Sequence, residues 1–351
     1  MSSTSSTRSC IEVILGTMTM GWEQASSTVD DAVAKQFIEV FHAAGGRSCD
    51  TARIYSGGAC EPMLGRALAA AAVSPALAIA TKAHPSQPGG LGAVGLRAQL
   101  DASLDALGVD SVDLFYLHQP DAANALAETL ATMAALLSEG KARAYGLSNF
   151  SVLETKRVFA LCAENAWPTP STFQGLLNPL NRLVEAELLP LLRAHGVRFF
   201  GYNPLCAGLL SGKHYQAQAA VPKGRFLDNP NYLPRYYSEG YLGAMELLRS
   251  ACDAEGVTMI DAAFRWLIHH SPLISGDGIL LGASSLAHLE QNLAACAAAT
   301  PLPDTIVAAL DEGWASVRDG AFPFWRGYSQ DMPGREGLDM GASYTAHGPA
   351  K

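Results

Sequence analysis

Four polar residues of catalytic type, Asp50, Tyr55, Lys82 and His118, stand at or just after the ends of short apolar runs. A tyrosine hydroxyl titrates at about pH 10 and becomes a useful acid near neutrality only when a nearby cation stabilises its phenolate. Lys82 is predicted to be that cation, and Asp50 to keep it charged, because a lone buried ammonium tends to lose its proton. The imidazole N–H of His118 would polarise a carbonyl. Together they predict a proton-donating site for carbonyl reduction.

Each of these residues also has an ordinary structural interpretation. A strand-end Asp is often a turn or cap residue, and a single His after an apolar strand is often only part of a hydrogen-bonded structure. A single Tyr or Lys carries even less information. The order and spacing of all four residues, each at a strand end, favour the joint catalytic interpretation.

Apolar runs of strand length alternate along the chain with longer amphipathic stretches of helical period. Strands are predicted at residues 13–18, 48–51, 77–82, 112–118, 142–148, 172–177, 198–203 and 278–282. Helices are predicted at residues 31–44, 60–71, 96–107, 122–138, 151–165, 185–195, 241–269, 286–296 and 304–318. This alternation predicts parallel strands joined by right-handed crossovers, and about eight such units predict an α/β fold of the (β/α)8 TIM barrel type.

An open, doubly wound sheet is the competing architecture. Its functional residues would come from two or three neighbouring strands, whereas those of a barrel come from the C-terminal ends of many strands. Here polar residues follow nearly every predicted strand: Asp50, Lys82, His118, Ser148 with Asn149, Gln174, Tyr202 with Asn203, and Ser284. This distribution favours the barrel.

A single barrel domain is predicted for residues 11–328. Residues 1–10 are expected to be a flexible N-terminus, and residues 329–351 a tail that is extended or disordered, because it lacks periodicity. The aromatic segment 321–326 is expected to fold back over the barrel mouth. Residues 90–95 satisfy GxGxxG, but prolines place a long loop before them, so they are interpreted as a flexible loop rather than a dinucleotide-binding turn.

Composition excludes several classes of partner. The net charge of -9 over 351 residues, without a dense Lys/Arg run, argues against nucleic acid or an anionic membrane surface. The seven cysteines are scattered and form no CxxC pair, and no apolar stretch reaches the ~18 residues of a membrane span. No metal site, no disulfide framework and a cytoplasmic location are therefore expected.

Six ordered motifs identify a resemblance between about Gly16 and Arg326. They are GTMTMG at residues 16–21, DTA with the tyrosine at 50–55, LFYLHQPD at 114–121, GLSNF at 146–150, YNPLCAGLLSGKHY at 202–215 and GASSLAHLEQNL at 282–293. The chain resembles the aldo-keto reductases, a superfamily of barrel enzymes that use NADPH. Within that superfamily it is most similar to the aflatoxin-aldehyde and succinic-semialdehyde reductase branch.

The resemblance implies a role for each matching position. The catalytic tetrad would be Asp50, Tyr55, Lys82 and His118, with Tyr55 as the general acid. The nicotinamide would be held by Ser148, Asn149, Gln174 and Tyr202. The loop over the pyrophosphate would include Asn203, Pro204, Leu205, Gly208, Leu210 and Lys213. The adenosine and 2'-phosphate site would include Ser284, Ser285, His288, Gln291 and Asn292, at a helix N-terminus that favours an anion.

Substrate-binding positions follow from the same resemblance: Trp22, Tyr55, His118, Arg225 and Arg326. The two arginines match positions that meet substrate carboxylates, and their alternative interpretation is that of solvated surface residues. The implied function is NADPH-dependent reduction of a small-molecule aldehyde or ketone to an alcohol. Two alternatives stay open: the same chemistry on a carbonyl intermediate of secondary metabolism, and a regulatory cofactor-binding subunit similar to potassium-channel β-subunits. Dimers are usual in this branch, so a homodimer is also expected.

Overall fold

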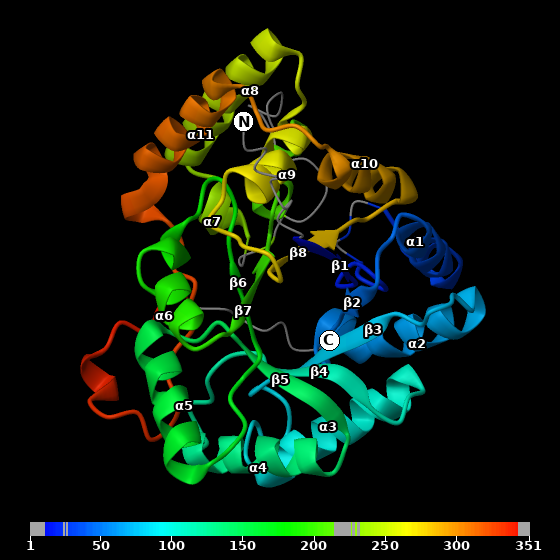
Figure 1. Ribbon diagram of the computed structural model, residues 1–351, viewed down its shortest axis with the longest axis vertical. Helices are drawn as coiled ribbons and strands as arrows, with labels where there is room; N and C mark the ends of the chain where they lie inside the picture. Colours follow the sequence, from blue (N-terminus) through cyan, green and yellow to red (C-terminus); the bar gives the residue numbers. More distant parts are fainter. Residues whose placement is uncertain are drawn as a thin grey trace, which may run out of the picture.

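The computed structural model describes residues 11–23, 25, 27–213, 226, 229 and 232–342. Within this part of the chain, eight parallel strands close into a barrel in sequence order, β1 to β8 (Figure 1). They are β1 Glu12–Gly16, β2 Ser48–Asp50, β3 Ala78–Ala83, β4 Val112–Leu117, β5 Ala142–Ser148, β6 Thr172–Leu176, β7 Arg198–Tyr202 and β8 Gly278–Gly282. The predicted (β/α)8 barrel is confirmed.

Helices surround the barrel and connect its strands. They are α1 Asp31–Ala43, α2 Cys60–Ala71, α3 Ala93–Leu107, α4 Leu126–Ser138, α5 Val152–Asn165, α6 Leu188–Ala194, α7 Leu233–Tyr236, α8 Glu239–Glu255, α9 Met259–His269, α10 Leu286–Ala297 and α11 Asp304–Val317. Figure 1 shows α8 and α11 packed side by side at one edge of the molecule. Short 3-10 turns include η1 Tyr55–Gly58 and η3 Cys206–Ser211.

Local chemistry explains where several helices begin and end. Asp30 and Ser151 accept hydrogen bonds from the backbone N–H groups of Val33 and Glu154, so each caps the first turn of its helix. Gly108 ends α3 and Gly256 ends α8 in left-handed conformations, with φ of 70° and 66°. Glycine adopts this conformation without the steric cost that a Cβ would add.

Several predicted helices differ from those observed; the helix predicted at 122–138, for example, begins at Leu126. The predicted helix 241–269 is two helices, α8 and α9, because the chain turns at Gly256 and Thr258 then caps α9. The predicted helix 185–195 has its α-helical part only at Leu188–Ala194. Pro190 is tolerated there because it lies in the first turn, where its missing N–H has no intrahelical partner.

Apolar side chains fill both sides of the sheet. Outward-facing strand residues such as Phe115 and Phe199 pack beneath the helices in the main core. A second, smaller cluster lies inside the barrel: Ile14, Leu114, Tyr116, Phe200 and Leu280. The Tyr116 ring fits because the facing position is Gly146, where a Cβ would lie 2.5 Å from the ring.

The glycine-rich segment 90–95 is packed, so its interpretation as a flexible loop was wrong. The backbone N–H of Leu91 donates to Asp121 Oδ2 at 2.7 Å, and Gln99 Nε2 donates to the carbonyl of Gly90 at 2.8 Å. Buried side chains from neighbouring elements thus satisfy the loop backbone, which the sequence motif alone does not reveal.

Residues 329–342 of the C-terminal tail, for which an extended or disordered segment is predicted, have almost no regular secondary structure and make specific polar contacts with the barrel. The backbone N–H of Gln330 donates to the carbonyl of Asp121 at 2.9 Å. Asp331 accepts from Arg157 Nη1 at 3.2 Å and from the backbone N–H of Leu126 at 2.9 Å. Figure 1 shows this red segment beside α5. Polar contacts fix the tail, which explains why it has no apolar periodicity.

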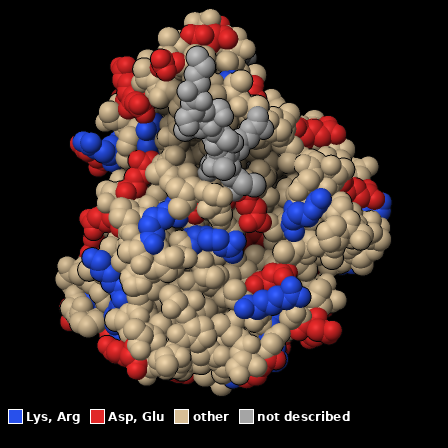
Figure 2. All heavy atoms as spheres, viewed as in Figure 1, with Lys and Arg blue, Asp and Glu red and all other residues tan. Residues whose placement is uncertain are grey.

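Acidic and basic side chains are intermingled on the face drawn in Figure 2. In the described ranges, no helix combines the length and apolar character needed to cross a bilayer.

Candidate active site

Because of the register between neighbouring strands, each successive catalytic candidate along the chain lies closer to the barrel mouth than the one before it. Asp50 on β2 pairs with Ala80 on β3, so Lys82 lies two residues higher on the same inward face. Lys82 in turn pairs with Tyr116 on β4, so His118 lies two residues higher again. Because side chains alternate along a strand, all of these residues face the barrel axis. The stagger of a closed barrel therefore converts three strand ends into one column of side chains.

Lys82 and Asp50 form a buried ion pair at the base of this column. Lys82 Nζ donates to Asp50 Oδ1 and, at 2.7 Å, to the carbonyl of Thr51. Gln174 Nε2 donates to Asp50 Oδ2 at 2.8 Å. Burial lowers the pKa of Lys82 and raises the pKa of Asp50, and the opposite charge of each partner counteracts both shifts. Pairing thus allows an ammonium to persist inside the barrel.

Tyr55 begins η1, in the loop that follows β2. The backbone N–H of Arg53 donates to the carbonyl of Lys82 at 3.2 Å, which holds this loop against the end of β3. Lys82 Nζ consequently lies 5.1 Å from the centroid of the Tyr55 ring. The half-buried Tyr55 is thus placed beside the cation predicted to assist it.

His118 lies between Tyr55 and a second histidine, His84. Its ring centroid is 5.9 Å from that of Tyr55 and 5.2 Å from that of His84, and both contacts are nearly perpendicular. Burial lowers the pKa of His118 well below its usual value, and the positive charges of Lys82 and Arg326 lower it further. His118 is therefore a neutral imidazole near pH 7, the form that can donate an N–H to a carbonyl oxygen without being a cation.

The next strand ends supply an amide and hydroxyl network on the same rim. Asn149, with φ of 59°, donates from Nδ2 to the carbonyl of His118 at 2.8 Å and to Ser148 Oγ at 3.0 Å. Tyr202 on β7 donates its hydroxyl hydrogen to Asn149 Oδ1 at 2.7 Å. Asn149 thus links the predicted nicotinamide-binding residues Ser148 and Tyr202, and Gln174 lies deeper, on Asp50.

The predicted pyrophosphate loop follows β7 without a break. Asn203 adopts φ of 59°, and its carbonyl accepts from Asn178 Nδ2 at 3.1 Å. Pro204 and Leu210 are buried, Leu205 and Gly208 are half-buried, and Lys213 is exposed. The exposed end of this predicted segment therefore carries its single cation, Lys213.

The predicted adenosine-phosphate residues lie at the first turns of α10. Ser285 caps the helix by accepting the His288 N–H at 3.2 Å, and Ser284 Oγ lies 3.2 Å from His288 Nδ1. Burial and the charge of nearby Lys213 lower the pKa of His288. Gln291 is exposed, whereas Asn292 is buried and donates to the carbonyl of Gly282 at 3.1 Å. Asn292 thus joins α10 to β8.

Of the predicted substrate residues, Trp22 is half-buried in the β1–α1 connection and Arg225 lies outside the described residues. The backbone N–H of Arg326 donates to the carbonyl of Asn149 at 2.9 Å, which confirms that segment 321–326 returns to the mouth. The charge of Arg326 also lowers the pKa values of His118 and His84.

Two residues near the mouth were missed from the sequence. His84 could have been found, because it continues the inward alternation of Ala80 and Lys82 past the end of β3. Arg235 lies on the short helix α7, is 5% exposed, and places its guanidinium 3.8 Å from the centroid of the Phe322 ring. Nothing in the local sequence around Arg235 indicates this position, because it depends on a contact with Phe322, which is 87 residues further along the chain.

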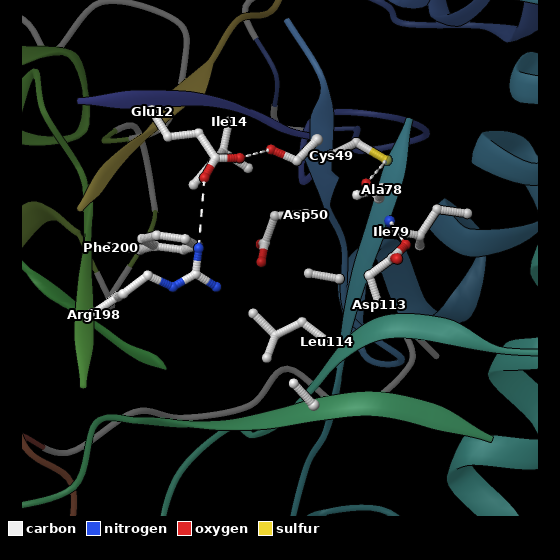
Figure 3. Close-up of a pocket in the computed structure, with 13 residues that line it drawn as sticks. Glu12, Ile14, Cys49, Asp50, Ala78, Ile79, Asp113, Leu114, Arg198 and Phe200 are labelled. Carbon is white, nitrogen blue, oxygen red and sulfur yellow. Dashed lines mark hydrogen bonds and ion pairs between the residues drawn. The ribbon is translucent and has the colours of Figure 1, made fainter. Parts of the chain in front are cut away.

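A cavity of about 150 Å³ approaches Asp50 from the opposite, N-terminal end of the barrel (Figure 3). Figure 3 shows the Asp50 carboxylate directed into it, among Ile14, Leu114 and Phe200. Glu12 and Arg198, 3.9 Å apart, also line it. This cavity is on the side of Asp50 away from His118, so it is separate from the mouth where Tyr55 and His118 meet.

Comparison of the chain with a family model, with known protein sequences and with solved structures finds similar proteins in each case. The model of the Aldo/keto reductase family matches residues 12–315. Aflatoxin B1 aldehyde reductase member 2 of Mus musculus is 40% identical over 316 residues, which cover 87% of this chain and 84% of the mouse protein. Aldo-keto reductase family 7 member A3 of Homo sapiens is also 40% identical, with 87% of this chain and 94% of the human protein covered. The structure of a glycerol dehydrogenase from Gluconobacter oxydans has a TM-score of 0.71 and 26% identity, covering 86% of this chain and 91% of that one.

Proposed function

Because this chain belongs to the aldo/keto reductase family, and is thus an oxidoreductase of aldehydes or ketones, we propose that it reduces a carbonyl to an alcohol with NADPH and a proton from Tyr55. The observation that carries the proposal is the column of Asp50, Lys82 and His118 with Tyr55 beside it. A buried cation beside a tyrosine and a neutral imidazole is the arrangement that donation of a phenolic proton to a carbonyl requires.

Each side chain has one task in this mechanism. Tyr55 gives its proton to the carbonyl oxygen as the carbon accepts a hydride. Lys82 stabilises the phenolate that remains, and Asp50 keeps Lys82 charged. His118 donates an N–H to the same oxygen and so orients the carbonyl. The neutral state of His118 avoids a further positive charge in a buried space that already holds Lys82.

NADPH, when bound, supplies the hydride. The polar groups of Ser148 and Asn149 suit the nicotinamide carboxamide, and the Tyr202 ring suits its flat face. Lys213 and the N-terminus of α10 suit the phosphate groups, since a cation and a helix N-terminus both favour an anion. This pairing supports NADPH over NADH, because the additional charge of NADPH is its 2'-phosphate.

Arg326 supports a substrate class for this site. Its charge acts on both His118 and Tyr202 at the mouth. An aldehyde that carries a carboxylate, or a dialdehyde with electron-rich oxygens, would therefore be favoured over an uncharged alkyl aldehyde. A screen of small aldehydes with and without a carboxylate would test this preference by comparing kcat/KM.

Replacement of Tyr55 by Phe tests the proposed chemistry. General acid catalysis commonly contributes about 10² to 10⁴ in rate, so Tyr55→Phe should lower kcat for NADPH-dependent aldehyde reduction by that factor. NADPH affinity, measured by fluorescence titration, should change little. Near-full activity of Tyr55→Phe would overturn the assignment.

Tyr116→Phe is the matched control. Tyr116 also lies beside Lys82, whose Nζ is 5.6 Å from its ring centroid, but its hydroxyl is buried inside the barrel. Loss of the Tyr116 hydroxyl should leave kcat within about threefold of the original value, since the ring and the Lys82–Asp50 ion pair remain. An equal fall in both variants would mean that the rate depends on packing around Lys82 rather than on a proton from Tyr55.

A further inference from the structure

A cavity of about 150 Å³ enters the barrel from the end opposite the mouth, and the mechanism above makes no use of it. Its walls include the first residues of several strands, among them Glu12, Ser48 and Arg198, and its inner end is Asp50. Figure 3 shows the Asp50 carboxylate pointing into this space. A single water needs only about 10 to 15 Å³ open to its centre, so the cavity has room for several waters.

Polar groups stand at both ends of the cavity, which is the condition for water to remain inside a protein. At the outer end, Ser48 donates its hydroxyl hydrogen to Glu12 Oε1, and Glu12 lies 3.9 Å from Arg198. The Glu12 and Arg198 side chains are 36% and 46% exposed, so this end of the cavity meets solvent. The entrance is therefore formed by partly hydrated charges instead of an apolar plug.

The Asp50–Lys82 ion pair meets this space through Asp50. The Lys82 side chain is fully buried, whereas that of Asp50 is 3% exposed. Lys82 Nζ donates to Asp50 Oδ1 and Gln174 Nε2 donates to Oδ2, so each oxygen accepts from one side chain. An ionised carboxylate has about four acceptor sites, so acceptor sites remain for water. Burial raises the pKa of Asp50, although Lys82 counteracts the shift, and this favours brief protonation of the carboxylate.

The reaction proposed above consumes a proton that solvent must replace. The carbonyl carbon receives an electron pair with the hydride, and the oxygen takes its proton from Tyr55, which is left as a phenolate. A carbonyl and a nicotinamide bound at the mouth exclude water from it. The Lys82 ammonium lies on the inner side, 5.1 Å from the centroid of the Tyr55 ring. A proton supplied through Asp50 and Lys82 therefore arrives without passing the bound substrate.

We propose that this cavity is a water-filled proton route, through which the Asp50–Lys82 pair exchanges protons with solvent from the N-terminal end of the barrel. Lys82 gives a proton to the Tyr55 phenolate and becomes a neutral amine. A proton from the cavity water then binds Asp50 and moves across the hydrogen bond to Lys82, so the ion pair and Tyr55 are restored and one solvent proton is consumed. The transfer to Tyr55 rests on the proposed function, whereas exchange between the ion pair and the cavity does not.

Proton exchange of the Lys82 ammonium, measured by NMR of protein labelled with ¹⁵N-lysine, tests the route without any substrate. The Lys82 signal is assigned by its loss in Lys82→Met. Ala144 on β5 lines the cavity and has a small side chain, so Ala144→Leu fills the space. Exchange with water should then slow about tenfold or more, because it would depend on transient opening of the barrel. An unchanged exchange rate in Ala144→Leu would contradict the proposal.

Further variants and the cofactor separate the cavity from other causes. Ala144→Val adds a smaller side chain that suits a strand, so it keeps the test available if Leu disturbs the barrel, and it should slow exchange less. Leu114→Ala enlarges the cavity and should speed exchange. Asp113→Asn is the matched control and should leave exchange unchanged, because it keeps the volume and both Asp113 oxygens accept from groups other than Lys82. Exchange that stops when NADP⁺ binds would mean that solvent reaches Lys82 from the mouth, and it would reject the route.

Kinetics supply the second measurement. In Ala144→Leu, kcat for aldehyde reduction should fall and the solvent deuterium isotope effect on kcat should rise, because the resupply of a proton becomes slower than the chemical step. KM and the Kd for NADPH should not change, because the mouth is unaltered. An isotope effect equal to that of the unaltered chain would reject the supply of protons to Tyr55 by this route. If the unaltered chain reduces no carbonyl, the proposed function fails, and the ammonium exchange still decides the role of the cavity.

Discussion

Asp50→Asn separates the charge of Asp50 from its shape. Asparagine keeps an oxygen that can accept from Lys82 Nζ, but it removes the negative charge that offsets the burial of the ammonium. Breaking a buried ion pair by neutralising one partner costs about 3 to 5 kcal/mol. Loss of this charge therefore lowers the pKa of Lys82 further, because burial is no longer offset by the Asp50 carboxylate.

The direction of the pH dependence follows from which protonation form of Lys82 is active. Burial already lowers the pKa of Lys82, and in the proposed mechanism the ammonium is the form that stabilises the Tyr55 phenolate. Activity should therefore be present at low pH and fall as the pH rises through the pKa of Lys82. In Asp50→Asn this fall should move towards lower pH, so the loss of activity is larger at pH 8 than at pH 6.

The assay is kcat/KM for aldehyde reduction between about pH 5.5 and pH 10, at constant ionic strength. Asp113→Asn is the control, because Asp113 lines the same cavity but pairs with Arg143 at 2.8 Å, away from Lys82. Its profile should match that of the unaltered chain. A uniform loss in Asp50→Asn at every pH would refute the reasoning, since it would show that the charge of Asp50 does not act by setting the pKa of Lys82.

Two further predictions concern the loop 90–95 and the C-terminal tail, whose packing was not expected from the sequence. Gly95→Ala should lower the free energy of unfolding in urea by about 1 to 3 kcal/mol, because the new Cβ would lie 2.4 Å from the Gly89 carbonyl carbon. The control is Gly243→Ala in α8, where a Cβ meets nothing within 4 Å, and this change should be neutral or slightly stabilising. Equal effects of the two changes would mean that the 90–95 loop is loosely packed. Asp331→Ala should cost about 1 to 2 kcal/mol, because it removes the Arg157 ion pair and the acceptor for the first turn of α4. An unchanged unfolding midpoint would show that the tail contributes nothing to stability.

The barrel and its column of candidate catalytic residues could be predicted because both depend on order along the chain. In a closed barrel of sequential parallel strands, neighbours in sequence are neighbours in space. A polar residue at the end of each apolar run therefore reaches the same rim, whatever the details of packing. Asp50, Lys82 and His118 were accessible to this reasoning, and Asn149 and Tyr202 follow by the same rule at β5 and β7.

The remaining features depend on contacts between distant segments that have no local pattern. Asp331 meets Arg157 across 174 positions, and the tail is held by backbone and charged groups rather than by an apolar face. The loop 90–95 is ordered by Asp121, thirty residues beyond it. Polar contacts of this kind depend on the direction of individual donors and acceptors, which composition and periodicity do not encode.

By itself, the amino-acid order determined a parallel barrel and the residue types that face its mouth. Only the tertiary structure decided how these residues act on one another: that Lys82 and Asp50 are both buried, and that His84 lies perpendicular to His118. The physical reason is that alternation along a strand specifies on which face a side chain lies, whereas burial and the orientation of a ring are set by every element that closes around it.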